Sequence, residues 1–199
     1  MPINAVLDIK EEYPLYGYTE PVTLQEVKDY CKIDFDEDDT LLTLLITAAR
    51  ENLEKYLGVS IVQKNLTVIV NNEDGGIEIP YGPTPDAIDV TTILDIDGNA
   101  IETQWILITG NDFKQLQLPC WPFIQMSYTA GYVPVWQSLT EGGVVLPQAI
   151  KFAIMAQVFF NYDNRGEAGN VGRGYVNTFV CDAAKQLCNK YKRNTELSL

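Results

Sequence analysis

Six consecutive residues, DFDEDD, carry five carboxylates at a spacing that resembles a calcium loop. Asp34, Asp36 and Asp38 match the first three oxygen ligands of D-x-D-x-D-G. The sixth position needs Gly but holds Asp39, and the twelfth needs a bidentate Glu but holds Leu45. Calcium binding by this segment is therefore disfavoured, and two other interpretations of its acids remain open. The acids can cap a helix and lie near the positive end of its dipole, or they can form a negative surface that faces DNA.

Catalysis also has little support in the sequence. There is no histidine, which removes the commonest general base and excludes Ser-His-Asp and Cys-His sites. The four cysteines show no metal-ligand spacing, and Cys181 and Cys188 are too far apart along one helix for a disulfide. The glycine-rich segment 166–174 follows a predicted helix instead of a strand, so we expect a connector and not a phosphate loop. We expect no enzyme, no cofactor and no metal.

The charge of the chain is strongly acidic and unevenly spread. The 14 basic residues are outnumbered by 27 acidic ones, giving a net charge of −13. Such a protein is not expected to grip the phosphate backbone as a whole. Residues 1–40 carry 3 basic and 11 acidic side chains, whereas residues 175–199 carry 4 and 2. The two ends are therefore expected to face different neighbours, and the basic end is a candidate docking segment for an acidic partner.

Two helices are predicted in the first part of the chain. A capping box from Thr23 to Glu26 begins a short helix. Apolar residues at helical spacing then predict a long helix from Asp39 to Leu57, and Gly58 ends it.

Residues 59–135 change to the alternating pattern of strands and predict an all-β unit of roughly five to seven strands. Residues 71–76, NNEDGG, predict a hairpin connection between the first two strands, and Asp97-Gly98-Asn99 predicts a later turn. The strand candidates are residues 66–70, 77–80, 88–96, 101–108, 114–118 and 123–132.

Helices resume after the β unit. Residues 149–164 are apolar on nearly every face, which is typical of a helix that is central in a core or shared with a partner. A final helix is predicted from about residue 177 to 192, and it ends in the basic sequence KYKR.

These elements predict an α+β fold. Its core is an antiparallel bundle of about four helices, and the all-β unit is inserted between the second and third main helices. The expected parts are an N-terminal arm (1–21), a helical core (22–58 and 146–193), the β insert (59–135), a linker (136–145) and a C-terminal tail (194–199).

The order of these motifs resembles the head–tail connector family of tailed bacteriophages, which are head-completion adaptor or DNA-packaging proteins. The family pattern D-x-x-D-D-x-L-L, followed by A-A-R-E-x-[VL]-E-x-Y-[LT]-G, lies between Asp36 and Gly58. YTAGY (128–132), LPQAIKFAIMAQVFFNYDNRG (146–166) and a basic last helix follow in the family order. The final helix departs from the pattern, because the Pro that commonly begins it is absent.

The resemblance implies a structural virion protein of the neck, assembled in the host cytoplasm. Such proteins form a ring, typically of twelve copies, that extends the DNA channel below the portal protein and offers a platform for a stopper or tail-completion protein. DNA passes without sequence-specific binding, and no membrane is involved.

Three sets of residues are candidates for these contacts. The portal-docking candidates are Lys185, Lys190, Tyr191, Lys192 and Arg193. The subunit-interface candidates are Phe152, Met155, Phe159 and Phe160. The candidates for channel-facing acids are Asp34, Asp36, Glu37, Asp38 and Asp39. A different class of protein also fits the pattern, namely a ligand- or glycan-binding module on the β insert with a helical dimerisation stalk.

Overall fold

The computed structural model divides the chain into two compact units, and its helices and antiparallel strands confirm the α+β class. The β unit comprises Met1–Tyr18, Gly58–Val145 and Asn194–Leu199, and the helical unit comprises Thr19–Leu57 and Leu146–Arg193. Within the residues that the structure describes, no helix is long and apolar enough to cross a membrane. Those residues are 6–13, 18–72, 75–83, 92–95, 97–101, 106–109, 114–133, 144–165 and 180–193.

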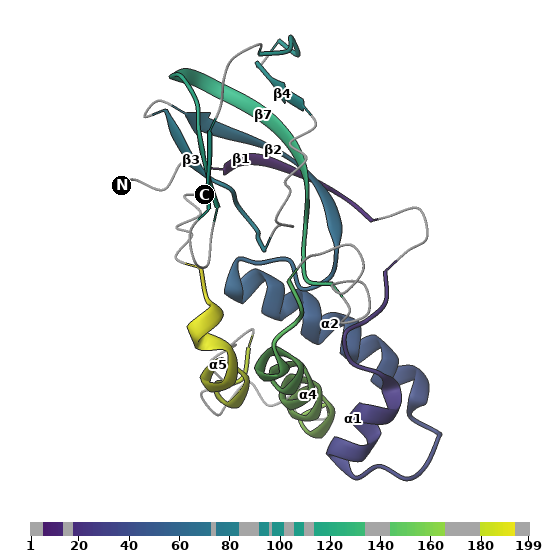
Figure 1. The fold of residues 1–199 in the computed structure, drawn as a ribbon. Coiled ribbons are helices and arrows are strands. Elements are labelled where there is room, and N and C mark those ends of the chain that lie inside the picture. Colours follow the sequence, from purple (N-terminus) through teal and green to yellow (C-terminus); the bar gives the residue numbers. More distant parts are fainter. Residues whose placement is uncertain are drawn as a thin grey trace, which may run out of the picture. The chain divides into compact units, whose positions relative to one another are not determined.

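The β unit holds two antiparallel sheets (Figure 1). The larger sheet has the order β1-β2-β7-β4, with β1 Val6–Glu12, β2 Lys64–Asn72, β7 Trp121–Ala130 and β4 Thr92–Leu94. The smaller sheet has the order β3-β6-β5, with β3 Gly76–Glu78, β6 Lys114–Gln117 and β5 Ile106–Thr109.

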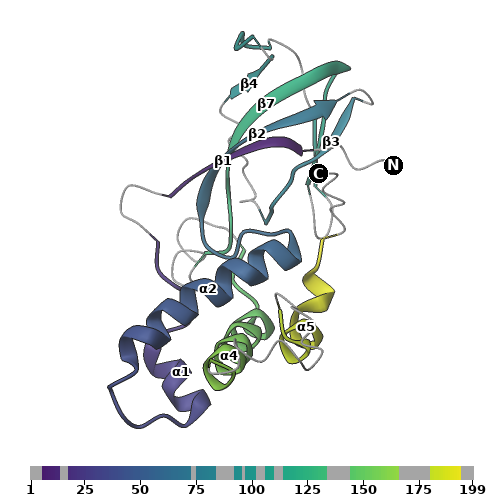
Figure 2. The ribbon, with the colours of Figure 1, turned by 180° about the vertical axis from the view of Figure 1, so that it is seen from behind.

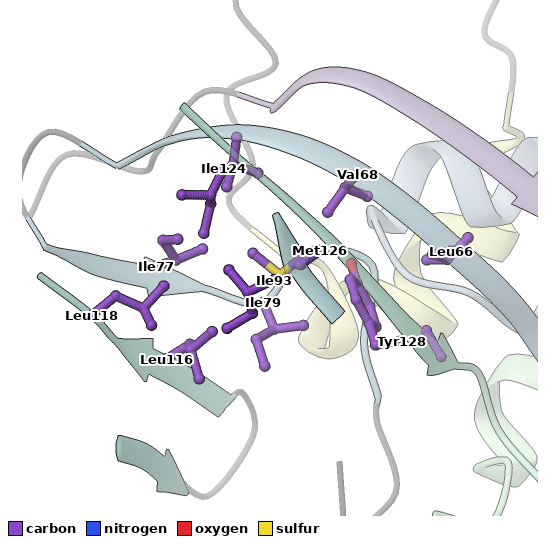
Figure 3. Packing of buried hydrophobic residues seen from close by; sticks show 12 residues of the cluster. Leu66, Val68, Ile77, Ile79, Ile93, Leu116, Leu118, Ile124, Met126 and Tyr128 are labelled. Atoms are coloured by element: carbon purple, nitrogen blue, oxygen red, sulfur yellow. The ribbon is translucent and has the colours of Figure 1, made fainter. Parts of the chain in front are cut away.

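The inner faces of these strands share one apolar core. Alternate residues of β2 and β7 are buried because successive side chains of a strand point to opposite faces. They meet side chains from β3, β4 and β6 and from the residues that follow β3 and β6, as Figure 3 shows for Ile77, Leu116 and Met126. Tyr128 also belongs to this cluster, and its hydroxyl donates to the carbonyl of Pro80 at 2.7 Å.

Two features of the β unit differ from the sequence expectations. The predicted hairpin between residues 66–70 and 77–80 is wrong, because β2 uses both of its edges for β1 and β7 while β3 pairs with β6. The segment expected to be only an N-terminal arm contains β1, which pairs antiparallel with β2 from Val6↔Val70 to Glu12↔Asn65. The predicted turn at Asp97-Gly98-Asn99 is confirmed, because Gly98 donates to the carbonyl of Asp95 at 3.1 Å.

The helical unit contains α1 Leu24–Cys31, α2 Asp39–Leu57, α4 Gln148–Asp163 and α5 Asp182–Cys188, followed by the 3₁₀ turn η1 Asn189–Tyr191. The capping box of α1 is confirmed, because Thr23 N donates to the Glu26 carboxylate at 2.8 Å and Glu26 N donates to the Thr23 hydroxyl at 3.2 Å. In both views α4 lies between α1 and α5, and it also packs against α2 (Figures 1 and 2). The last predicted helix begins only at Asp182 among the described residues, and positions 177–179 lie outside them.

Candidate assembly surfaces

The acidic segment between α1 and α2 is partly used for contacts within the helical unit. The buried ammonium of Lys28 donates to Asp36 at 2.5 Å and to Asp39 at 2.8 Å. The hydrogen bond that Lys28 donates to Asp36, and after it the one to Asp39, raises the pKa of Lys28 above the ordinary lysine value. These two acids therefore hold a cation of α1 against the start of α2.

Asp38 makes a second tertiary contact from the same segment. Its carbonyl accepts from Leu42 N at 2.8 Å, as an N-cap residue does, and its carboxylate accepts from the Tyr162 hydroxyl at 2.5 Å. Arg165 lies 3.4 Å from the same carboxylate and stacks on the Tyr162 ring at 4.1 Å from the centroid. Asp38 thus links the start of α2 to the end of α4, while Asp34 and Glu37 are exposed.

Replacing Asp39 with asparagine is expected to lower the free energy of unfolding of the helical unit, whereas Asp34→Asn is expected to leave it unchanged. The reason is that Asp39→Asn removes a charge partner of the buried Lys28, while Asp34 is exposed. Because the pKa of Lys28 is raised on folding, its contribution is present below the ordinary lysine pKa and lost as the pH rises through the folded value. Urea unfolding followed by circular dichroism at neutral and strongly alkaline pH measures both effects. Equal stabilities of the two variants would contradict the tertiary role.

The family-like sequence AARENLE places a fully buried arginine at the centre of an ion-pair network. The Arg50 Nε donates to Glu20 at 2.9 Å, and its Nη1 donates to Glu54 at 3.0 Å. Thr47 donates to the other oxygen of Glu20 at 2.9 Å. The i,i+4 spacing of Arg50 and Glu54 is visible in the sequence, but Glu20 is thirty residues away and no local pattern indicates it. The ion-pair network therefore gives AARENLE a structural role within the helical unit.

The predicted subunit-interface residues of α4 divide into two groups. Phe152 and Phe159 are 46% and 45% exposed and, being seven residues apart, lie on one side of the helix. Met155 is buried within the unit, and Phe160 is half-buried. The opposite side of α4 receives α5, where the buried Gln157 accepts from Cys181 N at 2.7 Å. The structure therefore leaves Phe152 and Phe159 as the exposed members of the predicted interface.

Two of the five predicted portal-docking residues, Lys192 and Arg193, lie against the end of α2. Arg193 is buried, and its backbone N–H donates to the Leu57 carbonyl at 2.8 Å, so its side chain is the least accessible of the predicted docking residues. Lys192 lies over the Tyr56 ring at 4.5 Å from the centroid. A basic side chain here also suits the negative end of the α2 dipole.

The other docking candidates lie nearer the surface. Lys185 pairs with Asp182 at 3.2 Å, and the exposed Lys190 lies over the half-buried Tyr191 at 4.7 Å from the ring centroid. Lys192 and Arg193 therefore pack against the end of α2 within the helical unit, and Lys190 lies at the surface of that unit.

Cys181, the residue before α5, and Cys188, the last residue of α5, are core thiols, as the sequence predicts. Cys181 and Cys188 are both free and buried, and burial raises the pKa of Cys188 to about 11. Its thiol donates to the Ala184 carbonyl at 3.0 Å. Among the residues that the structure describes, no three His, Cys, Asp or Glu side chains group as metal ligands would.

Part of the sequence matches a family of known proteins. Residues 21–92 match the family of phage gp6-like head-tail connector proteins. No curated protein matches the sequence. That family is one of connectors and not of enzymes.

Solved structures share the fold over nearly the whole chain. One is from the neck of an empty gene transfer agent (GTA) particle, with 16% identity, a TM-score of 0.64, and 97% of this chain and 99% of that chain covered. Another is from the virion of a native GTA particle, with 15% identity, a TM-score of 0.65 and the same coverage. The family match over residues 21–92 and the shared fold confirm the resemblance to the head–tail connector family that the order of motifs in the sequence predicts.

Proposed function

We propose that the chain is a structural adaptor in the neck of a virion, built on an antiparallel bundle of about four helices with an inserted β unit. It forms a ring below the portal protein. In the head–tail connector family that this chain resembles, the ring typically has twelve copies. The ring extends the DNA channel and provides the platform for a stopper or tail-completion protein. The observation that carries the proposal is the fold shared with a neck protein over 97% of this chain.

The net charge supports passage of DNA without adhesion. At −13 the chain repels phosphates, so a channel wall made of it presents few sites at which DNA stops. The acidic segment contributes less to such a wall than its five acids suggest, because Asp36, Asp38 and Asp39 have cationic partners inside the helical unit. Asp34, Asp36 and Glu37 are the exposed acids of that segment and the first candidates for a channel-facing position.

Phe159→Asp is expected to prevent ring formation while leaving the helical unit folded. Phe159 is already 45% exposed, so the charge need not enter the core, but it would desolvate poorly in a subunit contact. Self-association is expected to weaken by about tenfold or more. Sedimentation velocity measures the oligomer, and circular dichroism measures the fold.

Gln25→Asp provides the control, because it adds the same charge to an exposed position of another helix, α1, and so lies off the α4 face that carries Phe152 and Phe159. If Phe159→Asp assembles as well as Gln25→Asp does, the aromatic pair is not a subunit contact.

Removing residues 194–199 keeps the predicted docking residues and is expected to weaken co-purification with the portal protein, through loss of the tail alone, without unfolding the chain. Arg193, whose backbone N–H donates to the Leu57 carbonyl, lies before the deleted residues in the sequence. The described contacts of the helical unit are therefore kept. Deleting the whole end from residue 180 would not be informative, because Val180, Ala184 and Cys188 are core residues. Portal capture that is unchanged by the short deletion would rule out docking through the tail.

A further inference from the structure

The helical unit presents an acidic surface that also carries exposed apolar side chains. It surrounds the connection of α1 to α2, and we define this acidic corner by Tyr30, Asp34, Phe35, Glu37 and Leu44, all of which are exposed. Residues 28–39 hold 6 acidic and 2 basic side chains, a net of −4. Of the two lysines, Lys28 is buried on Asp36 and Asp39, and Lys32 is exposed. An exposed set of apolar side chains with unbalanced acids suits a partner that is basic and apolar.

A basic surface with an exposed apolar side chain lies on α5 and η1. Residues 182–193 hold 1 acidic and 4 basic side chains, a net of +3, and Arg193 is the buried one of the four basic side chains. Leu187 is 40% exposed, and Ala183 and Lys190 are exposed beside it at helical spacing. We define this basic end by Ala183, Lys185, Leu187 and Lys190. Its apolar and cationic groups complement those of the acidic corner.

The two surfaces belong to helices on opposite sides of α4. α4 packs against both α1 and α5, and the two opposite views show α1 on one side of it and α5 on the other (Figures 1 and 2). One molecule therefore cannot satisfy both surfaces with each other. Two copies can, and each added copy leaves one acidic corner and one basic end unpaired. This is the arrangement from which head-to-tail rings close.

We propose that the acidic corner of one copy binds the basic end of a second copy of this chain. The contact specifies how subunits of the proposed ring meet, and in that sense it rests on the proposed function. Copies with a charge of −13 repel one another overall, so a stable contact requires a local match of opposite sign. The exposed Lys190, with Leu187 as its apolar neighbour, supplies that match to Glu37 and Asp34. This contact places Asp34 and Glu37 between subunits, and for these two acids it is the alternative to a position on the channel wall.

Site-directed disulfide formation tests the contact in the full chain. Cys31→Ser and Cys120→Ser remove the half-buried and the exposed thiol, while the buried Cys181 and Cys188 stay. One preparation then carries Glu37→Cys and another carries Lys190→Cys. Mixing the two is expected to give at least about tenfold more disulfide-linked dimer than either preparation alone, because only the mixture joins a corner to an end. A mixture that gives no more dimer than the separate preparations would overturn the proposal.

Charge exchange provides a second measurement that does not depend on new cysteines. Asp34→Lys with Glu37→Lys, or Lys190→Glu with Lys185→Glu, is expected to weaken self-association about tenfold, and mixing the two reversed chains is expected to restore association. If reversing the corner instead abolishes capture of another neck protein and leaves self-association unchanged, the occupant is not a second copy. Rings that are seen in purified necks without the Glu37–Lys190 crosslink would disprove this contact while the neck function stands. If the crosslink forms but the chain is absent from purified necks, the contact stands and the neck function is disproved.

Discussion

Replacing Arg50 with methionine is expected to lower the free energy of unfolding of the helical unit by about 3–5 kcal/mol. The Arg50 side chain is fully buried and donates to Glu20 and Glu54, the latter nearly buried as well. Removing the guanidinium leaves two carboxylates with their negative charge uncompensated in the interior. Thr47 still donates to Glu20, but a hydroxyl cannot balance the charge.

The two units offer separate spectroscopic signals for this measurement. All three tryptophans, at positions 105, 121 and 136, lie within the β unit, whereas helices α1, α2, α4 and α5 lie in the helical unit. Urea unfolding followed by ellipticity at the helical wavelength is therefore expected to shift in Arg50→Met, and tryptophan fluorescence is expected to shift less.

Three further substitutions show whether the effect comes from the buried network. Glu51→Gln changes a carboxylate that lies 3.5 Å from the same arginine but is exposed, so it is expected to cost at most about 1 kcal/mol. Arg50→Lys keeps the charge but cannot donate to Glu20 and Glu54 with one planar group, so a large loss is expected to remain. Arg50→Met combined with Glu20→Gln and Glu54→Gln is expected to recover part of the stability. A methionine variant as stable as the wild type would show that the buried ion pairs contribute nothing.

The helical elements were predictable because their signals are local. The capping box at Thr23, the apolar spacing of Asp39–Leu57 and the apolar run of α4 each lie within one helix, and the structure has all three. The burial of Cys181 and Cys188 followed in the same way from one helical stripe. A local pattern decides such features because the side chains concerned are neighbours on one element.

The strand pairing was not predictable in the same way, because it depends on which edges are free. The hairpin expected after β2 fits a two-strand pattern, yet β1 and β7 occupy both edges of β2. β1 itself gives no alternating signal, because it is an edge strand whose side chains are mostly exposed. Its position is fixed by backbone pairing with a strand more than fifty residues away.

The candidate surfaces were predictable as segments but not as individual residues. The acidic segment was correctly placed at the start of α2, whereas the partners of Asp38 and Asp39, Tyr162 and Lys28, lie on other helices. Arg193 carries the charge expected of a docking residue, but its backbone N–H donates to the Leu57 carbonyl and its side chain is buried. Charge and hydropathy locate such segments, and only the tertiary structure shows which of their side chains remain exposed.

Gly131→Ala is expected to destabilise the β unit by about 4 kcal/mol or more. Gly131 follows β7 within YTAGY, has a φ of +118°, and donates from its N–H to the Pro83 carbonyl at 2.8 Å. A Cβ here would overlap the Val62 carbonyl oxygen and lie 2.6 Å from the carbonyl carbon. Because these are backbone atoms, no side-chain rotation relieves the clash, and the backbone of one segment has to move.

Two other glycines separate the steric clash from the cost of the backbone conformation. Gly98 has a φ of +84°, and a methyl group added to it would meet no atom within 4 Å, so Gly98→Ala is expected to cost only about 1–2 kcal/mol. Gly76 has open space and no positive φ, so Gly76→Ala is expected to change stability by about 0.5 kcal/mol at most. Tryptophan fluorescence during urea unfolding ranks the three variants within the β unit. If Gly131→Ala were no worse than Gly98→Ala, the close approach to Val62 would have to relax at little cost, and YTAGY would require glycine for its dihedral angle alone.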